Sequence, residues 1–460
     1  MSMKQYQTII DDHFPKYFFA GFTDTPADVD VLNATQAQVV LYEKVTWALP
    51  NDADVLEEKG LRYGENPGQE CALYRPINGN LVFAGIEFLG SDTGLVGGLK
   101  NESLLQFGKH PSKTNLTDID SGLGILKYFS DHPCAVIMKH NNPSGVALGD
   151  TLFQAYTKAF EADPIAPFGG TLVLNRSLDT ATARAISGQY YEVVCAPEYE
   201  EGTLEILAQR KNLRVVKIKE IERLQEYVGQ RFLETKCLQD GSIMHQWSYV
   251  PTVGSNQTVI RTFQDFKEHV EIPQGIPLRS TQGTKVVRTG ETVDIKRKPT
   301  EAELKDMWFA WMVETCVTSN SVLTAKNLAT ISIGAGGQDR VMMAKQCVTR
   351  AYVSRQALLA LQKFGVNYDA LALQVKAGEK PESVLREIEE AVREDHAGLE
   401  GAVVASDAFF PFRDGVDALL EQGIKAIVQP GGSLRDADAV QACNEHNATM
   451  VFTAMRCFKH

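Results

Sequence analysis

Short, uniformly apolar runs recur along this chain, and helical patterns lie between many of them. The run at residues 134–138 follows a helical pattern over residues 118–132 and suits a strand that is buried on both faces. Comparable runs cover residues 171–174, 192–196, 329–333, 402–405, 426–428 and 449–452. This alternation predicts an α/β fold with layered helices.

The length of 460 residues predicts more than one domain. Residues 1–60 are polar and irregular, and we expect an N-terminal extension there. Residues 265–300 lose the alternation, which indicates a linker or crossing segment, and we assign residues 231–299 to it. Thr300 and Glu303 then form a capping box that starts the next helix. We therefore expect two similar α/β units, at 61–230 and 300–460.

The charge balance narrows the function classes. Lys and Arg total 46 and Asp and Glu total 58, a net charge of −12 that disfavours non-specific nucleic-acid or membrane binding. No apolar run approaches the roughly 18 residues of a membrane span, and the first residues lack a signal-peptide pattern. We expect a cytoplasmic protein, and a locally basic pocket could still bind an anionic substrate. The eight cysteines form no CxxC pair, which disfavours a structural zinc site.

Two motifs carry cations beside other polar groups. Lys139 and His140 end an apolar strand, where they offer a cation and a general base, with Pro143 and Gly145 expected to shape the turn. A strand-end turn with a solvated lysine fits the pattern equally well. Arg62 and Tyr63 open the segment RYGENPGQ, in which the guanidinium suits a phosphate; a plain surface turn is as good an interpretation.

Three motifs combine glycine or aromatic residues with polar groups. The segment 163–170 (DPIAPFGG) allows backbone approach to a flat ligand, although alone it favours a structural turn. Asn320, with the glycine-rich segment 331–340, matches neither the dinucleotide-binding nor the P-loop pattern, and ordinary turn chemistry explains it equally. The segment 405–414 (ASDAFFPFRD) suits a planar heterocycle, or else a Phe-rich core corner capped by Asp.

The sixth motif is the segment 451–460 (VFTAMRCFKH), an apolar strand followed by Arg456 and His460. Together and in this order, the six motifs resemble the AICAR transformylase portion of the bifunctional purine-biosynthesis enzymes, where AICAR is 5-aminoimidazole-4-carboxamide ribonucleotide. The resemblance runs from about residue 61 to residue 460. It implies two cytidine deaminase-like, three-layer α/β units without zinc, since Cys134 lacks the second Cys of the zinc signature. Only 60 residues precede it, so we expect no IMP cyclohydrolase domain.

The resemblance also implies the residue roles. The catalytic residues would be Lys139, His140 and Asn320. The AICAR contacts would be Arg62, Tyr63, Asn115, Phe168, Gly169, Glu192, Arg456 and His460. The folate contacts would be Arg340, Val341, Phe409, Phe412, Asp414 and Ser433.

The implied reaction moves the formyl group of 10-formyltetrahydrofolate, a co-substrate, to the 5-amino group of AICAR and gives FAICAR without a metal. The resemblance further implies a homodimer with shared active sites and a separate IMP cyclohydrolase that takes the product. One rival function is a purine-ribotide-binding regulatory protein, which would be expected to lose Lys139, His140 or Asn320. Another is a formylase that uses formate and ATP, which the lack of a P-loop weakly disfavours.

Overall fold

The structure is a computed structural model. It describes residues 13–22, 38–50, 55–63, 70–77, 95–107, 110–231, 233–240, 243–282 and 285–460. Two compact units divide the chain: unit 1 comprises Met1–Leu123 and Thr171–Val250, and unit 2 comprises Gly124–Gly170 and Pro251–His460. Residues 124–170 thus group with the C-terminal unit, whereas the sequence suggested one unit over 61–230. The α/β class is confirmed, and the deaminase-like and zinc-free assignments stay predictions.

Unit 1 contains a small N-terminal sheet, a four-stranded series and short helices. The first group is β1 (Tyr17–Phe22), β2 (Gln38–Lys44) and β5 (Tyr74–Pro76), with β3 (Trp47–Pro50) and β4 (Leu56–Lys59) as a separate hairpin. The series runs in the order β9 (Gly170–Leu174), β10 (Tyr191–Ala196), β11 (Arg214–Lys217) and β6 (Leu104–Gln106). The remaining elements are η3 (Asn101–Ser103), α1 (Lys113–Leu126), α3 (Thr180–Ser187), α4 (Thr203–Leu207), η4 (Lys219–Tyr227), β12 (Leu233–Cys237) and β13 (Ile243–Trp247).

Unit 2 is built on a mixed sheet. Its strands follow the order β22 (Thr449–Phe452), β21 (Ala426–Gln429), β20 (Val403–Ser406), β18 (Val322–Lys326), β19 (Ala329–Gly334), β8 (Asn142–Leu148) and β7 (Cys134–Lys139). The pairs β20–β21 and β21–β22 are parallel, whereas β18 pairs antiparallel with β19 and β20, and β7 pairs antiparallel with β8.

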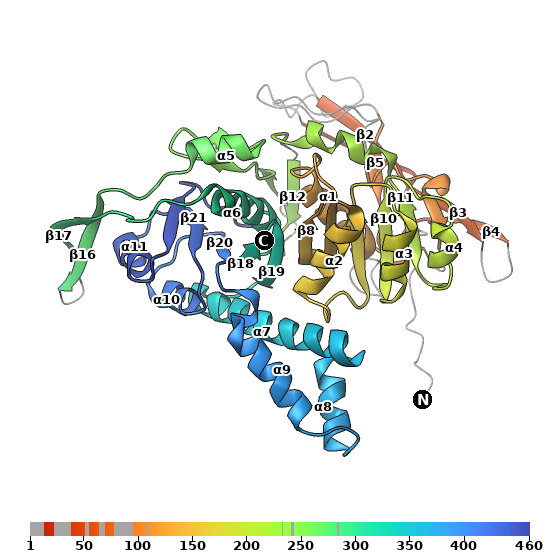
Figure 1. The fold of residues 1–460 in the computed structure, drawn as a ribbon. Helices are drawn as coiled ribbons and strands as arrows, with labels where there is room; N and C mark the ends of the chain where they lie inside the picture. Colours follow the sequence, from red (N-terminus) through yellow and green to blue (C-terminus); the bar gives the residue numbers. More distant parts are fainter. Residues whose placement is uncertain are drawn as a thin grey trace. The chain divides into compact units, whose positions relative to one another are not determined.

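Helices cover the strands of unit 2. Figure 1 shows α6 (Glu301–Glu314) above β18, β20 and β21, with α7 (Arg340–Phe364) and α10 (Asp414–Leu420) below them. The other helices are α2 (Leu152–Ala162), α5 (Phe263–His269), α8 (Tyr368–Lys376), α9 (Ser383–Glu394), η5 (His396–Gly398) and α11 (Asp436–Glu445). The core is made of fully buried side chains such as Trp311, Phe309 and Phe410. Each such burial contributes on the order of 1.5–3 kcal/mol.

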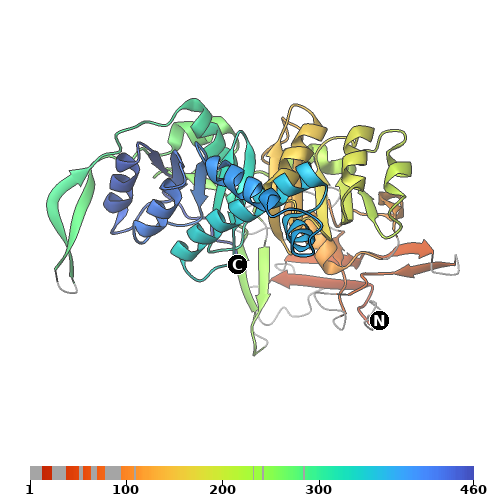
Figure 2. The same cartoon turned by 60° about the horizontal axis from the view of Figure 1, so that its bottom comes forward.

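The sequence-based element predictions can be compared with these bounds. The apolar runs match β7, β9, β10, β19, β20, β21 and β22 closely, and the capping box at Thr300 and Glu303 starts α6. The helix expected over residues 118–132 is α1, which begins and ends earlier. The segment expected as a linker contains two-stranded pairs, β14 (Thr252–Val253) with β15 (Thr258–Val259) and β16 (Ile276–Gln282) with β17 (Lys285–Val293). The second pair is a hairpin that projects from unit 2 (Figure 1, Figure 2).

Among the helices that the structure describes, none has the length and apolar character needed to span a bilayer.

Candidate active site

Lys139 and His140 lie at the tip of the β7–β8 hairpin in unit 2. Lys139 pairs with Asn142, and the two residues between them are left-handed, with φ of 55° at His140 and 60° at Asn141. Two consecutive positive φ values are the mark of a tight two-residue hairpin turn. The turn is therefore made by His140 and Asn141, and the expectation that Pro143 and Gly145 shape it is wrong, because both lie within β8.

The hairpin tip is hydrogen-bonded to three other segments of unit 2. Lys139 Nζ donates to the Phe168 carbonyl at 2.7 Å. The Asn142 side-chain oxygen accepts the Thr318 N–H at 2.8 Å, just before the turn that carries Asn320. Lys459 Nζ donates to the Asn141 carbonyl at 2.8 Å. These bonds place His140, which is exposed, beside the segments that carry Asn320 and Arg456.

Asn320 and Arg340 are bonded to each other. Arg340 is the first residue of α7, where the Asp339 side chain accepts the Met342 N–H at 2.8 Å and caps the helix. One Arg340 Nη2–H donates to the Asn320 side-chain oxygen at 2.7 Å, and Asn320 Nδ2 donates to the Gly337 carbonyl at 3.0 Å. The amide of Asn320 is thus held at both its oxygen and its nitrogen.

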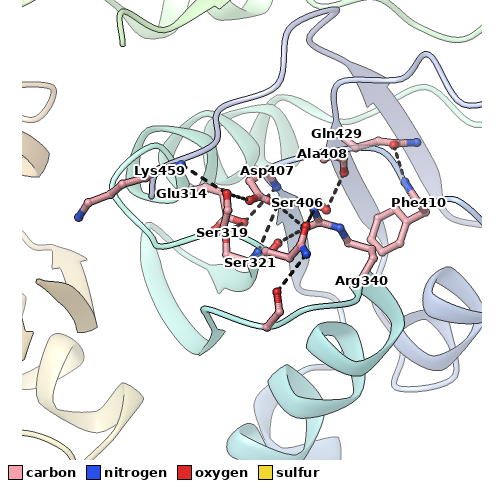
Figure 3. Close-up of polar contacts among 12 residues, drawn as sticks. Glu314, Ser319, Ser321, Arg340, Ser406, Asp407, Ala408, Phe410, Gln429 and Lys459 are labelled. Atoms are coloured by element: carbon pink, nitrogen blue, oxygen red, sulfur yellow. Dashed lines mark hydrogen bonds and ion pairs between the residues drawn. The ribbon is translucent and has the colours of Figure 1, made fainter. Parts of the chain in front are cut away.

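Two buried acids, Glu314 and Asp407, lie behind this pair, and both are 0% exposed. Asp407 accepts bonds from Arg340, the Ser319 hydroxyl and the Ser321 N–H, as Figure 3 shows. Burial, and then the nearby charge of Asp407, raise the pKa of Glu314 well above its usual range. The sequence analysis assigned a role to neither acid, although Asp407 lies within the motif at 405–414 and Glu314 ends an apolar run.

One open pocket of about 590 Å³ gathers predicted residues from several segments of unit 2. Its lining includes Asn320, Arg340, Phe409 and Arg456. The Arg456 guanidinium lies 4.5 Å from the centre of the Phe458 ring, which also lines the pocket. Cationic, amide and aromatic groups therefore converge on one cavity, a combination suited to a planar ligand that carries negative charge. A second pocket of about 220 Å³, partly lined by Lys158 and Arg355, contains no predicted site residue.

The other predicted folate residues do not line this pocket. Phe412 is 60% exposed. Asp414 begins α10 and accepts the Gly415 N–H at 2.9 Å, and the N-cap of that helix is Arg413. The Ser433 hydroxyl accepts the Arg435 N–H at 3.0 Å. Val341 follows Arg340 on α7. The predicted AICAR residues Phe168, Gly169 and His460 are also absent from its lining.

The predicted residues of unit 1 form a separate polar group. Asn115 on α1 donates to Glu192 on β10 at 3.1 Å, and the Arg62 guanidinium lies 4.7 Å from the centre of the Tyr63 ring. Arg214, which sequence reasoning missed, is buried and lies 3.7 Å from the Glu192 carboxylate. Burial lowers the pKa of Arg214, and Glu192 opposes that shift. The rest of the RYGENPGQ motif, residues 64–69, lies outside the described residues.

No group of three or more His, Cys, Asp or Glu side chains is arranged to hold a metal ion in the described ranges.

Known proteins with similar sequences help to interpret the site residues described above. The sequence model described as "AICARFT/IMPCHase bienzyme" matches residues 27–269 and 255–350, which is more than half of the chain. The chain belongs to this family. The matched AICARFT/IMPCHase ranges contain Lys139, His140, Asn320 and Arg340, whereas Phe409 and Arg456 lie beyond them.

Relatives within the AICARFT/IMPCHase family carry the name bifunctional purine biosynthesis protein PurH. The protein from Persephonella marina is 36% identical over 401 residues, which cover 87% of this chain and 59% of that protein. The protein from Aquifex aeolicus is 32% identical over 426 residues, which cover 93% of this chain and 64% of that protein. The chain therefore spans about three fifths of the length of the curated relatives it matches.

Proposed function

We propose that this member of the family transfers the formyl group of 10-formyltetrahydrofolate to the 5-amino group of AICAR and produces FAICAR and tetrahydrofolate. The observation that carries the proposal is the convergence of Asn320, Arg340, Phe409 and Arg456 on one pocket. The hairpin with Lys139 and His140 does not line this pocket, but it is bonded to Thr318 and Lys459, in the segments that carry Asn320 and Arg456. Family membership supports purine biosynthesis as the setting.

The chemistry needs a base, an orienting group and a cation. The 5-amino group of AICAR is a poor nucleophile because it is conjugated with the amide-bearing imidazole. His140 takes the amine proton as the nitrogen attacks the formyl carbon, and Asn320 orients the amine. Lys139 stabilises the tetrahedral oxyanion; its bond to Phe168 uses one of three ammonium N–H donors and leaves two.

The intermediate collapses when the bond between the formyl carbon and folate N10 breaks. N10 then accepts a proton, either from Lys139 or relayed from His140. Both routes give the same overall count of atoms and protons. No step of the proposal uses a metal.

The binding roles follow the family resemblance. We assign the folate to Arg340, Val341, Phe409, Phe412, Asp414 and Ser433. We assign AICAR to Arg62, Tyr63, Asn115, Phe168, Gly169, Glu192, Arg456 and His460. Since Arg340 also holds Asn320, its role in folate binding is partly indirect. A homodimer with shared active sites belongs to the same proposal.

One assay separates the proposal from its rivals. The purified protein is given AICAR with either 10-formyltetrahydrofolate or formate plus ATP, and FAICAR, tetrahydrofolate and IMP are followed separately. We expect FAICAR and tetrahydrofolate in equal amounts with the folate donor only. Turnover with formate and ATP alone would replace the donor, and AICAR binding without turnover with either donor would favour the regulatory protein. Enzyme-dependent IMP would contradict the expectation that cyclohydrolase activity is lacking.

A further inference from the structure

Asp407 follows β20 and is fully buried behind the pocket wall. Its carboxylate accepts the Ser319 hydroxyl and, at 3.2 Å, the Ser321 N–H. These two residues flank Asn320, so one carboxylate fixes the turn on both sides of the amide that lines the pocket (Figure 3).

Asp407 is also connected to Asn320 through the side chain of Arg340. It pairs with Arg340 Nη1, and the other terminal nitrogen of the same guanidinium donates to the Asn320 side-chain oxygen at 2.7 Å. The planar fork of an arginine transmits orientation from one acceptor to the other. Burial and the charge of Asp407 raise the pKa of Glu314 beside it, and Asp407 itself forms the buried ion pair with Arg340.

The C-terminal segment is bonded to the same residue. The Asp407 carbonyl accepts the Cys457 N–H at 3.0 Å, and the Ser319 hydroxyl accepts the Lys459 N–H at 3.3 Å. Arg456, next to Cys457, lines the pocket, as does Phe409 two residues after Asp407. Three segments that supply the pocket wall therefore meet at one buried aspartate.

We infer that Asp407 is the positioning residue of this pocket: without contacting a ligand, it orients Asn320 and Arg340 for the transfer step. The inference rests on the proposed function, because the orientation matters for turnover only if Asn320 acts on the reacting amine. It concerns a residue absent from the pocket lining, and it predicts an effect on the chemical step rather than on binding.

The test compares Asp407→Asn with Asp306→Asn. Asp306 is a matched control in unit 2: it is also buried, and it holds the β18–β19 turn by accepting the Asn327 and Leu328 N–H groups at 2.9 and 2.8 Å. Because an error of about 1 Å in positioning costs on the order of 10²-fold in rate, we expect Asp407→Asn to lower kcat by about that factor. The KM for AICAR should change less than about threefold. Asp306→Asn should lower Tm by a comparable amount and keep kcat.

The results that overturn the inference are distinct. A folded Asp407→Asn protein with wild-type kcat, or an equal loss of kcat in Asp306→Asn, reduces Asp407 to a structural residue. If Asp407→Asn does not fold, Ser319→Ala takes its place. It removes one contact of the Asp407 carboxylate, together with the acceptor of the Lys459 N–H, and should lower kcat about tenfold. Wild-type kcat in Ser319→Ala would then refute the inference.

If the wild-type protein does not formylate AICAR, the proposed function fails by itself. Amide hydrogen exchange then decides the positioning role. Exchange at residues 319–321 and 456–459 should accelerate in Asp407→Asn, or in Ser319→Ala if the first variant does not fold, and not in Asp306→Asn. Unchanged exchange would overturn the inference.

Discussion

Asp436, the first residue of α11, should make the stability of unit 2 depend on pH. It is 6% exposed, one of its carboxylate oxygens accepts the Gly432 N–H at 2.8 Å, and the other has no partner among the described residues. Burial raises its pKa from 3.8 to about 6, against the opposing hydrogen bonds from Gly432 and Ser433. The shift of about two units corresponds to about 3 kcal/mol.

The sign of the effect follows from where the proton binds. The folded state holds the proton more tightly than the unfolded state, so this contribution to stability is complete below about pH 4 and is lost as the pH rises through 6. Asp436→Asn carries no charge at any pH and keeps an acceptor for the Gly432 N–H. We compare the free energy of unfolding of the variant with that of the wild type at each pH. Between pH 4 and pH 7.5, this difference should shift in favour of the variant by about 3 kcal/mol.

Thermal melts of both proteins from pH 4 to pH 7.5 measure this difference. At roughly 2–4 °C per kcal/mol for a domain of this size, the gap in Tm should widen by about 6–12 °C. Subtracting the gap at pH 4 removes any constant cost of the substitution. Asp438→Asn is the control, since Asp438 lies in the same first helical turn and pairs with Arg435 at 3.2 Å. A gap for Asp436→Asn that stays constant within about 1 °C would refute the reasoning.

Three further outcomes are expected. His140→Ala should lower kcat by at least about 10²-fold with AICAR affinity largely kept. His140→Asn is the control for the backbone, because asparagine tolerates the left-handed turn. If kcat of His140→Ala stays within about tenfold of wild type, His140 is not the base. Asp414→Ala should raise the folate KM by roughly one to two decades at unchanged Tm, whereas a lower Tm with the folate KM intact would make Asp414 a helix-start residue only. Thr300→Ala should lower the free energy of unfolding by about 1 kcal/mol because it removes the capping box with Glu303; Thr300→Ser should keep it, and equal melts for both variants would contradict the capping role.

The sequence predicted the elements of unit 2 well where a short stretch of neighbouring residues determines them. The run that became β7 is apolar throughout because it is buried on both faces. Helix α6 begins directly after its N-cap Thr300 because the capping box is complete within four residues. The hairpin tip at His140 and Asn141 was missed, since no glycine marks its left-handed turn. The antiparallel pairing of β7 with β8 depends on that turn.

The sequence predicted several residues of the candidate site, but not the hydrogen bonds and ion pairs that connect them. Asn320, Arg340, Phe409 and Arg456 were each proposed from their motifs, and the structure brings them to one pocket. The buried acid Asp407 was not proposed, because its partners come from segments far apart in the chain. Only the fold shows that its charge is matched by Arg340.

The bond from Lys459 to the Asn141 carbonyl joins residues that are 318 positions apart. At a synthesis rate of about 5–20 residues per second, the ribosome needs roughly 15–60 s to travel between them. During that interval the β7–β8 hairpin exists without its C-terminal clamp, and β21 has no β22 beside it. An unpaired strand edge is a template for association with other chains. The nascent protein should therefore depend on chaperones most strongly just before residues 449–459 emerge, and truncation before Thr449 should yield aggregates rather than a smaller folded protein.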